Sequence, residues 1–127
     1  ALHSISDLER VGDYAVNIVE YAEKLAEEGQ TFSEDARNEI TMLGDFIEKL
    51  FDKVMQCYQG DLDALDDAKA AEAAIDLITE QMTANHVARM VSGICTPEVG
   101  AHYIALVNDS ERIGDHFYNL AKAVRGL

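Results

Sequence analysis

The sequence predicts an all-α protein, an antiparallel up-down bundle of four long helices. Apolar residues recur every three or four positions through most of the chain, which is the spacing of one helix face. Short glycine-containing breaks divide the chain into four pieces, and no segment alternates strictly between apolar and polar residues as a strand does. A chain of 127 residues that is 48% hydrophobic is large enough for one domain with its own core.

The four predicted helices cover residues 2–28, 33–59, 61–92 and 97–125. Gly29 ends the first helix, and Gly60 ends the second. Ser33 has the character of an N-cap, with two acids following it in the first helical turn. Thr96 and Pro97 are a typical cap and first helical residue. Because the connections are short, we expect sequential helices to run antiparallel.

The charge of the chain restricts its partners. The 24 acids and 10 basic residues give a formal net charge of -14, which repels nucleic acid and anionic membrane surfaces and attracts cations. No run of about 18 apolar residues is present, so we expect no direct membrane insertion of this chain, which is predicted to be soluble. Cys57 and Cys95 are far apart and are expected to be reduced, small apolar side chains.

One sequence motif occurs twice, at residues 6–18 and 108–120. Six of the thirteen positions are identical, and they are polar residues plus glycine: Asp7/Asp109, Glu9/Glu111, Arg10/Arg112, Gly12/Gly114, Asp13/Asp115 and Asn17/Asn119. The offset of 102 residues makes the repeated unit several helices long. We therefore interpret residues 1–127 as a single domain from a longer protein. Residues 1–30 would be the last helix of a first repeat, and residues 31–127 a second three-helix repeat.

The two repeated glycines, Gly12 and Gly114, predict close contacts at these positions. A glycine within a helix costs about 1 kcal/mol relative to alanine. We therefore expect another helix or a ligand to approach Gly12 and Gly114 closely.

Three pairs of carboxylates are spaced by four residues, which places both members of a pair on one helix face. The pairs are Glu9 with Asp13, Glu72 with Asp76, and Glu111 with Asp115. Counted from the turn near residue 95, the second and third pairs lie within a band of roughly 10 Å along neighbouring helices. Four carboxylates that converge in this way suit Mg²⁺, Ca²⁺, Mn²⁺ or ferric iron, although acids at this spacing are also common on solvated surfaces.

Other polar residues have simpler interpretations. His116, beside Asp115, is a candidate nitrogen ligand or a supporting residue of the metal site. Arg10 and Arg112 are expected to pair with acids of adjacent helices. His86 and His102 are expected to be partly exposed, and no histidine stands at a spacing that would activate a cysteine. The sequence contains no recognisable catalytic set, so we predict that the chain is not an enzyme.

Residues 7–18 resemble the signature helix of the PhoU family, and residues 109–116 resemble its second copy. The stretch His86 to Arg89, then Gly93 to Cys95 and Gly100, leading into residues 111–116, is similar to the C-terminal PhoU-like domain of bacterial sodium/phosphate cotransporters of the type II-related family. Residues 2–7 fit the same group. The resemblance implies two three-helix bundles, control of phosphate uptake, and metal clusters on E(D)xxxD motifs. By position it implies these metal ligands: Glu72, Asp76, Glu111, Asp115, Glu9 and Asp13. The implied metal is iron or a divalent ion such as Mg, Mn, Zn or Ca.

The resemblance leads to two expectations about function. The first is a regulatory domain of a sodium-dependent phosphate cotransporter, on the cytoplasmic side of the inner or plasma membrane, whose partner is the transport domain of the same polypeptide. The alternative is a free-standing PhoU-type adaptor that acts on a sensor kinase and a phosphate ABC transporter. A metal-dependent hydrolase is a third hypothesis, because carboxylate clusters serve such chemistry. We also expect either a homodimer or packing of the first helix into the bundle.

Overall fold

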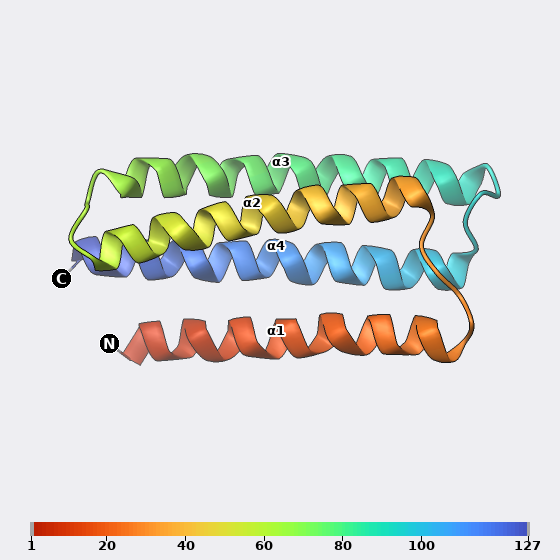
Figure 1. Ribbon diagram of the computed structural model, residues 1–127, viewed down its shortest axis with the longest axis horizontal. Coiled ribbons are helices and arrows are strands. Elements are labelled where there is room, and N and C mark those ends of the chain that lie inside the picture. The colour runs from red at the N-terminus through yellow and green to blue at the C-terminus, as the bar shows by residue number, and fades with distance from the viewer. Residues whose placement is uncertain (1, 127) are drawn as a thin grey trace.

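The computed structural model describes residues 2–126, and it confirms an all-α fold of long antiparallel helices (Figure 1). The helices are α1 (Leu2–Glu27), α2 (Glu34–Tyr58), α3 (Ala64–Val91) and α4 (Pro97–Gly126). Their bounds lie within one to three residues of the predicted ones, and the largest difference is the later start of α3. Among residues 2–126, none of the four helices is apolar over a stretch long enough to cross a membrane.

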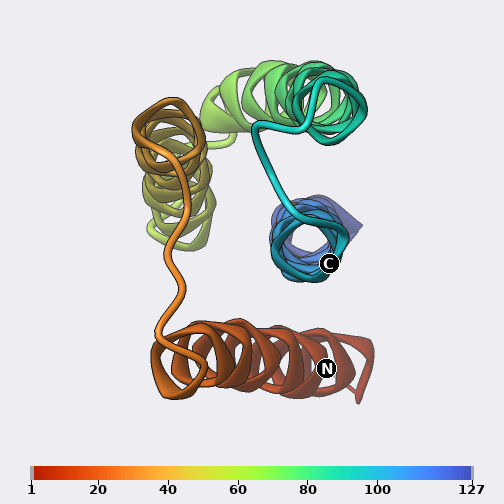
Figure 2. The ribbon, with the colours of Figure 1, turned by 90° about the vertical axis from the view of Figure 1, so that its right-hand side faces the viewer.

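Helices α2, α3 and α4 form the bundle, and α1 lies outside it. The helices α2, α3 and α4 contact one another, whereas α1 contacts α4 but neither α2 nor α3 within the described residues. Viewed from the end, α2, α3 and α4 occupy the corners of a triangle, and α1 lies beyond α4 (Figure 2). The first helix is therefore an outer layer on α4 and does not complete a symmetric four-helix core.

The predicted caps and breaks explain where the helices begin and end. The hydroxyl oxygen of Ser33 accepts a hydrogen bond from the backbone N–H of Ala36 at 3.2 Å, which confirms the N-cap of α2. Thr96 accepts one from the N–H of Val99 at 3.3 Å at the start of α4. The turns after α1, α2 and α3 contain glycines with positive φ, and at Gly60 φ is 100°, a conformation that favours glycine strongly.

The hydrophobic core runs along the axis of the α2–α3–α4 bundle. Its fully buried side chains include Leu43 and Leu50 from α2, Ile75 and Met82 from α3, and Tyr103 from α4. Cys57 is also buried, as expected for a small apolar side chain. Each helix contributes residues three or four positions apart, so the periodicity that predicts the helices also marks the faces that pack.

A largely buried polar network crosslinks the end of the bundle where α3 turns into α4. Arg89 donates hydrogen bonds to both carboxylate oxygens of Glu39, at 2.6 and 3.3 Å, and the hydroxyl of Tyr103 donates to the same carboxylate. Burial alone would raise the pKa of Glu39, but these hydrogen bonds outweigh it and hold the pKa below its ordinary value. The network thus ties α2, α3 and α4 together through one carboxylate.

His86 belongs to this network, so the expectation that it is partly exposed is wrong. The ring is 1% exposed and stacks on Tyr103 with 4.0 Å between centroids. Arg89 donates to Nδ1 at 3.2 Å, so the ring proton lies on Nε2, which is 3.1 Å from the Cys95 sulfur. Sequence spacing gave no indication of this cysteine–histidine contact, because the turn after α3 folds Cys95 back over the helix. With Nδ1 accepting and Nε2 protonated, His86 is not placed to act as a base toward Cys95.

Candidate metal centre

Two carboxylate pairs meet where α3 and α4 run side by side. Glu72 and Asp76 are one turn apart on α3, and Glu111 and Asp115 are one turn apart on α4. Because the helices are antiparallel and joined by a short turn, Glu72 lies at the height of Asp115 and Asp76 at the height of Glu111. The matched heights predicted from the sequence are therefore present in the structure.

The carboxylates lie close enough to share a cation. Glu72, Asp76 and Asp115 each offer an oxygen, and these oxygens all lie within 4.8 Å of one another. Glu111 completes the cluster, since its carboxyl interacts with those of Asp115 and Asp76. Asp76 is exposed, and the other three are partly buried. We call these four residues the carboxylate cluster.

The cluster is electrostatically strained without a cation. Burial raises the pKa of Glu72 to about 7, and the neighbouring carboxyls of Asp115 and Asp76 add to the effect. Burial and the charges of Asp115 and Asp76 also raise the pKa of Glu111. A positive ion between the helices would relieve this repulsion, and that is the physical reason the cluster fits a metal.

The donor set indicates which metals fit. All four donors are carboxylate oxygens, which suits hard cations such as Mg²⁺, Ca²⁺, Mn²⁺ or ferric iron better than metals that prefer nitrogen or sulfur. An open pocket of about 410 Å³ lies beside the cluster, and Asp76 and Glu111 form part of its wall together with Thr79, Thr83 and Asn108. The cluster is thus accessible from solvent, with room for water or an anionic ligand on a bound ion.

The third predicted pair lies elsewhere. Glu9 and Asp13 are exposed on α1, and they belong to no cluster of three or more potential ligands among residues 2–126. Of the six predicted ligands, the structure therefore brings together four.

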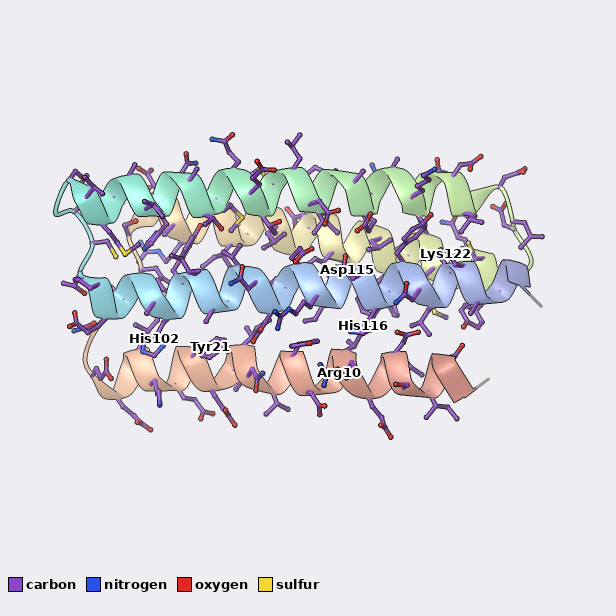
Figure 3. All side chains as sticks on the ribbon, turned by 180° about the vertical axis from the view of Figure 1, so that it is seen from behind. Arg10, Tyr21, His102, Asp115, His116 and Lys122 are labelled. Carbon is purple, nitrogen blue, oxygen red and sulfur yellow. The ribbon has the colours of Figure 1, made fainter. Side chains whose placement is uncertain are left out.

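His116 faces away from the carboxylate cluster, so the expectation that it supports the metal site is wrong. Figure 3 shows its ring between α4 and α1, while Asp115 lies on the side of α4 nearer α3. Its Nδ1 atom lies 2.7 Å from a carboxylate oxygen of Asp7, and Asn119 donates to the same oxygen at 3.4 Å. These contacts hold α1 against α4.

Tyr14 is the centre of the α1–α4 contact. It is 8% exposed and stacks against His116, with 5.9 Å between the ring centroids. His116 occupies the position equivalent to Tyr14 in the second copy of the motif. Arg10 donates to the Tyr14 hydroxyl at 2.8 Å, and the guanidinium of Arg112 lies 5.8 Å from the ring centroid. The expectation that the two arginines pair with acids is wrong, because neither forms an ion pair among residues 2–126. Both lie over the Tyr14 ring, where a cation is attracted to the π face.

Two repeated aspartates have a role that sequence reasoning missed. Asp7 pairs with His116, and Asp109 accepts a hydrogen bond from the Tyr21 hydroxyl at 2.8 Å. Asp109 is also one of the few buried polar residues. Both aspartates therefore join α1 to α4, and their identity in the two copies of the motif was the available indication.

The two repeated glycines differ in their surroundings. A side-chain carbon at Gly114 would lie 3.4 Å from Ile75, so a neighbouring helix does approach there. No atom lies within 4 Å of the same position at Gly12. The expected close approach is therefore found at Gly114 and is absent at Gly12.

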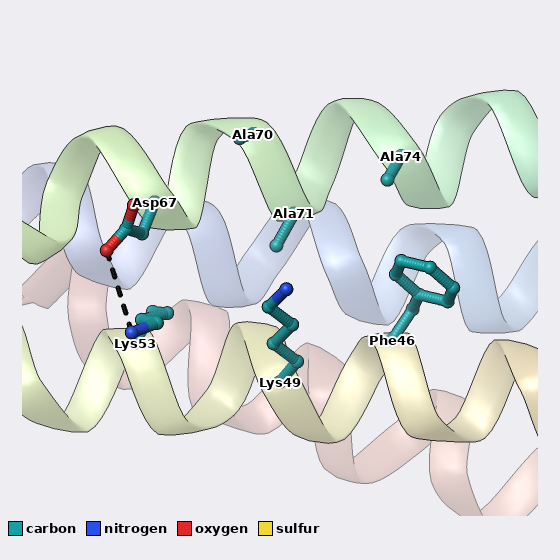
Figure 4. A pocket seen from close by; sticks show the side chains of 7 residues that line it. All are labelled: Phe46, Lys49, Lys53, Asp67, Ala70, Ala71 and Ala74. Carbon is teal, nitrogen blue, oxygen red and sulfur yellow. Dashed lines mark ion pairs between the residues drawn. The ribbon is translucent and has the colours of Figure 1, made fainter.

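A second pocket, of about 270 Å³, opens between α2 and α3 (Figure 4). Alanines on α3 leave space there, and Lys49 and Lys53 extend into it from α2. Lys53 pairs with Asp67 at 3.5 Å, an exposed contact that contributes little to stability. The lysines of α2 are thus gathered on the side of the helix that faces α3.

Long antiparallel helices that carry facing pairs of carboxylates define an acidic helical domain suited to binding cations. The chain belongs to the PhoU family, because the PhoU domain matches residues 40–124. The match spans most of α2, all of α3 and nearly all of α4, and it includes all four residues of the carboxylate cluster.

Two curated proteins are similar over nearly the whole chain. A Thermotoga maritima protein, named as phosphate-specific transport system accessory protein PhoU homolog 1, is 30% identical over 119 residues, 94% of this chain and 51% of that protein. An uncharacterized protein of Deinococcus radiodurans is 28% identical over 126 residues, 98% of this chain and 45% of that protein. The chain thus spans about half the length of these curated relatives. No solved structure matches it significantly.

Proposed function

We propose that this chain is a metal-binding regulatory domain in the control of phosphate uptake, acting as an accessory of a phosphate-transport system. The observation that carries the proposal is the carboxylate cluster on α3 and α4 of a PhoU-family chain. Its partners would be proteins of the phosphate-transport machinery, at the cytoplasmic face of the membrane. The proposal assigns no chemical reaction to the chain.

The metal ligands in this proposal are Glu72, Asp76, Glu111 and Asp115. Three of them have oxygens within 4.8 Å of one another, and the raised pKa of Glu72 reflects crowding that a cation would relieve. Their side chains would supply the coordinating oxygens, and the open pocket beside them leaves positions for water or an anion. The ion itself would crosslink α3 and α4 and stabilise the bundle by its preferential binding to the folded chain.

The adaptor hypothesis fits better than the cotransporter hypothesis. A curated relative that matches 94% of this chain is named as an accessory protein of a phosphate-specific transport system. The cotransporter hypothesis depends on the resemblance of residues 2–7 and 86–116, and neither relative is named as a cotransporter. We therefore propose that the chain acts on a phosphate transporter as an accessory protein.

We further propose that α1 ends one repeat and that residues 31–127 form the next. The exposed face of α1 corresponds, at the repeat offset of 102, to the face of α4 that is buried in the bundle. Ile5 of α1 is 56% exposed, whereas the equivalent Val107 of α4 is 1% exposed. Val19 of α1 is likewise 56% exposed, whereas the equivalent Ala121 of α4 is 1% exposed. In this interpretation Glu9 and Asp13 bind metal only when a facing carboxylate pair is present.

The functional proposal is tested in the source organism. The chromosomal gene would carry Glu111→Gln with Asp115→Asn, and phosphate uptake would be measured in phosphate-rich and phosphate-poor medium. We expect uptake to lose its response to phosphate, while a matched strain with Glu23→Gln and Glu27→Gln, an exposed pair on α1 outside every proposed site, responds normally. An unchanged response in the first strain, at equal protein level, would contradict a regulatory role for the cluster.

A further inference from the structure

The pocket between α2 and α3 gathers basic side chains in an otherwise acidic chain. Its volume is about 270 Å³, and Lys49 and Lys53, one turn apart on α2, extend into it toward α3 (Figure 4). Within the part of the chain that the structure describes, Asp67 is the one acid that lines it, although the net charge of the chain is -14. Exposed charges are largely screened beyond about 8 Å at physiological ionic strength, so the lining residues act most strongly on an ion that enters. The pocket therefore presents two positive charges and one negative charge to a ligand.

The ammonium groups of the two lysines have few partners. The side chain of Lys53 is 25% exposed, and its nitrogen lies 3.5 Å from a carboxylate oxygen of Asp67 and 3.5 Å from the amide oxygen of Gln56. Both distances exceed the usual range of about 2.7–3.2 Å, and an ammonium group offers three donors. Among residues 2–126, Lys49 forms no ion pair, not even with Asp45 one turn before it. Both nitrogens therefore have donors left for an anionic ligand.

The other end of the pocket is apolar. Phe46 closes it on the α2 side, and Ala70, Ala71 and Ala74 form its wall on α3. Figure 4 shows the Phe46 ring opposite Ala74, on the far side of Lys49 from the ion pair of Lys53. The small alanine side chains leave the space that larger residues would fill, and an aromatic ring suits contact with a flat apolar group. The pocket thus has a cationic end and an apolar end.

We propose that this pocket binds a small phosphate monoester that carries a flat ring, the chemistry of a nucleoside monophosphate. Two ammonium groups one turn apart match a phosphate group, which carries a charge of about -1.5 to -2 and three acceptor oxygens. A carboxylate matches the pair less well, because it brings a single charge and two oxygens. The ring of the ligand would lie against Phe46 and the alanines, where burial of apolar surface adds affinity.

The size and place of the pocket are consistent with such a ligand. Sites for drug-sized molecules measure about 300 to 1,000 Å³, so a pocket of about 270 Å³ suits a compact ligand. The pocket lies between α2 and α3, whereas the carboxylate cluster lies between α3 and α4. The proposal therefore does not depend on a metal in the cluster, and the two sites can be tested separately.

The test titrates the whole chain with adenosine 5′-monophosphate, with adenosine and with inorganic phosphate. A chelator is present, so that phosphate does not bind through a metal at the carboxylate cluster. Two-dimensional NMR of the isotope-labelled chain reports both the affinity and the place of binding. We expect the monophosphate to shift resonances of residues 46–53 and 67–74, and to bind about tenfold more tightly than either of its two fragments. Equal affinity for inorganic phosphate, or shifts confined to other residues, would overturn the proposal.

Substitutions of lysine locate the cationic end. Lys49→Gln with Lys53→Gln should weaken binding of the monophosphate about tenfold or more, because it removes the charged donors. Lys24→Gln with Lys122→Gln removes the same charge at exposed positions outside the pocket, and this matched control should bind as the parent does. Circular dichroism should show unchanged helicity, because the ion pair of Lys53 contributes little to stability. Parental affinity in the first variant would overturn the proposal.

Two further variants test the charge and the shape of the site. Asp67→Asn removes the acid that competes for Lys53, so the monophosphate should bind about two- to fivefold more tightly. Asp66→Asn, at the neighbouring exposed acid outside the pocket lining, should have a smaller effect. Ala74→Leu fills the apolar end and should weaken binding of the monophosphate without weakening that of inorganic phosphate. Weaker binding in Asp67→Asn, or parental binding in Ala74→Leu, would overturn the proposal.

Discussion

Glu72 on α3 and Asp115 on α4 bring carboxylate oxygens within 4.8 Å of each other across the interface of two antiparallel helices. Asp76 adds a third oxygen within the same distance. Burial, together with these neighbours, raises the pKa of Glu72 to about 7, so the folded chain holds a proton that the unfolded chain would release at lower pH. A raised pKa makes the chain less stable as the pH rises, whereas a salt-bridged acid with a lowered pKa makes a protein more stable as the pH rises.

The metal-free chain should become less stable as the pH rises from about 4.5 to about 7. In that interval the folded state binds more protons than the unfolded state, so the free energy of unfolding falls with rising pH. Thermal unfolding in the presence of a chelator, at pH 5 and at pH 8, measures this difference. Glu72→Gln should reduce the difference, and Glu9→Gln, on an exposed site, should leave it unchanged. An equal pH dependence in Glu72→Gln would contradict the crowding of the cluster.

The partly buried pair of Glu39 and Arg89 should be a major contributor to stability. Arg89→Met removes the main donor of the Glu39 carboxylate, which keeps Tyr103 and Asn85 as donors, at an expected cost of about 1.5–3 kcal/mol. Chemical denaturation measures the cost, and Lys69→Met, at an exposed position on the same helix, should change stability by less than about 0.5 kcal/mol. A loss of under about 1 kcal/mol for Arg89→Met would show that the pair is not a structural crosslink.

Two glycines should respond oppositely to alanine. Gly12 lies within α1, and an added side-chain carbon there would meet no atom within 4 Å, so Gly12→Ala should stabilise the chain by up to about 1 kcal/mol. At Gly100 the added carbon would overlap the side chain of Met90, so Gly100→Ala should destabilise the chain by about 1–3 kcal/mol, as measured by chemical denaturation. Met90→Ala should remove most of that penalty in the double variant, and additive losses would refute the clash.

The two cysteines should differ in reactivity toward a thiol reagent. Cys57 is buried, so it should react only when the chain unfolds. Cys95 is partly exposed and should react in the folded state, although burial raises its pKa against the lowering influence of Arg89, and this slows the reaction at neutral pH. Reagent titration with and without denaturant separates the two. Rapid reaction of both thiols in the native chain would contradict the packing of Cys57.

Sequence patterns predicted the positions of the helices and of the carboxylates along the bundle axis. They did not predict which residues α1 contacts. Helix faces follow from the spacing of residues such as Leu43 and Leu50, and antiparallel counting from one turn places Glu72 opposite Asp115. Local patterns do not encode which helix a given face contacts. The repeated motif marked Asp7 but did not identify His116 as its partner, and the burial of His86 depends on stacking with Tyr103 from a different helix.

Metal binding to two matched variants tests the central claim most directly. Glu111→Gln with Asp115→Asn removes half of the carboxylate cluster, and Glu9→Gln with Asp13→Asn removes an equal pair from the exposed face of α1. Each protein would be stripped with chelator and titrated calorimetrically with Mn²⁺, Mg²⁺ and Ca²⁺, and its metal content after purification measured by mass spectrometry. We expect the parent and the α1 variant to bind one of these ions with equal affinity and the cluster variant to bind at least tenfold more weakly. Equal binding by all three proteins, or none by the parent, would contradict a metal centre between α3 and α4.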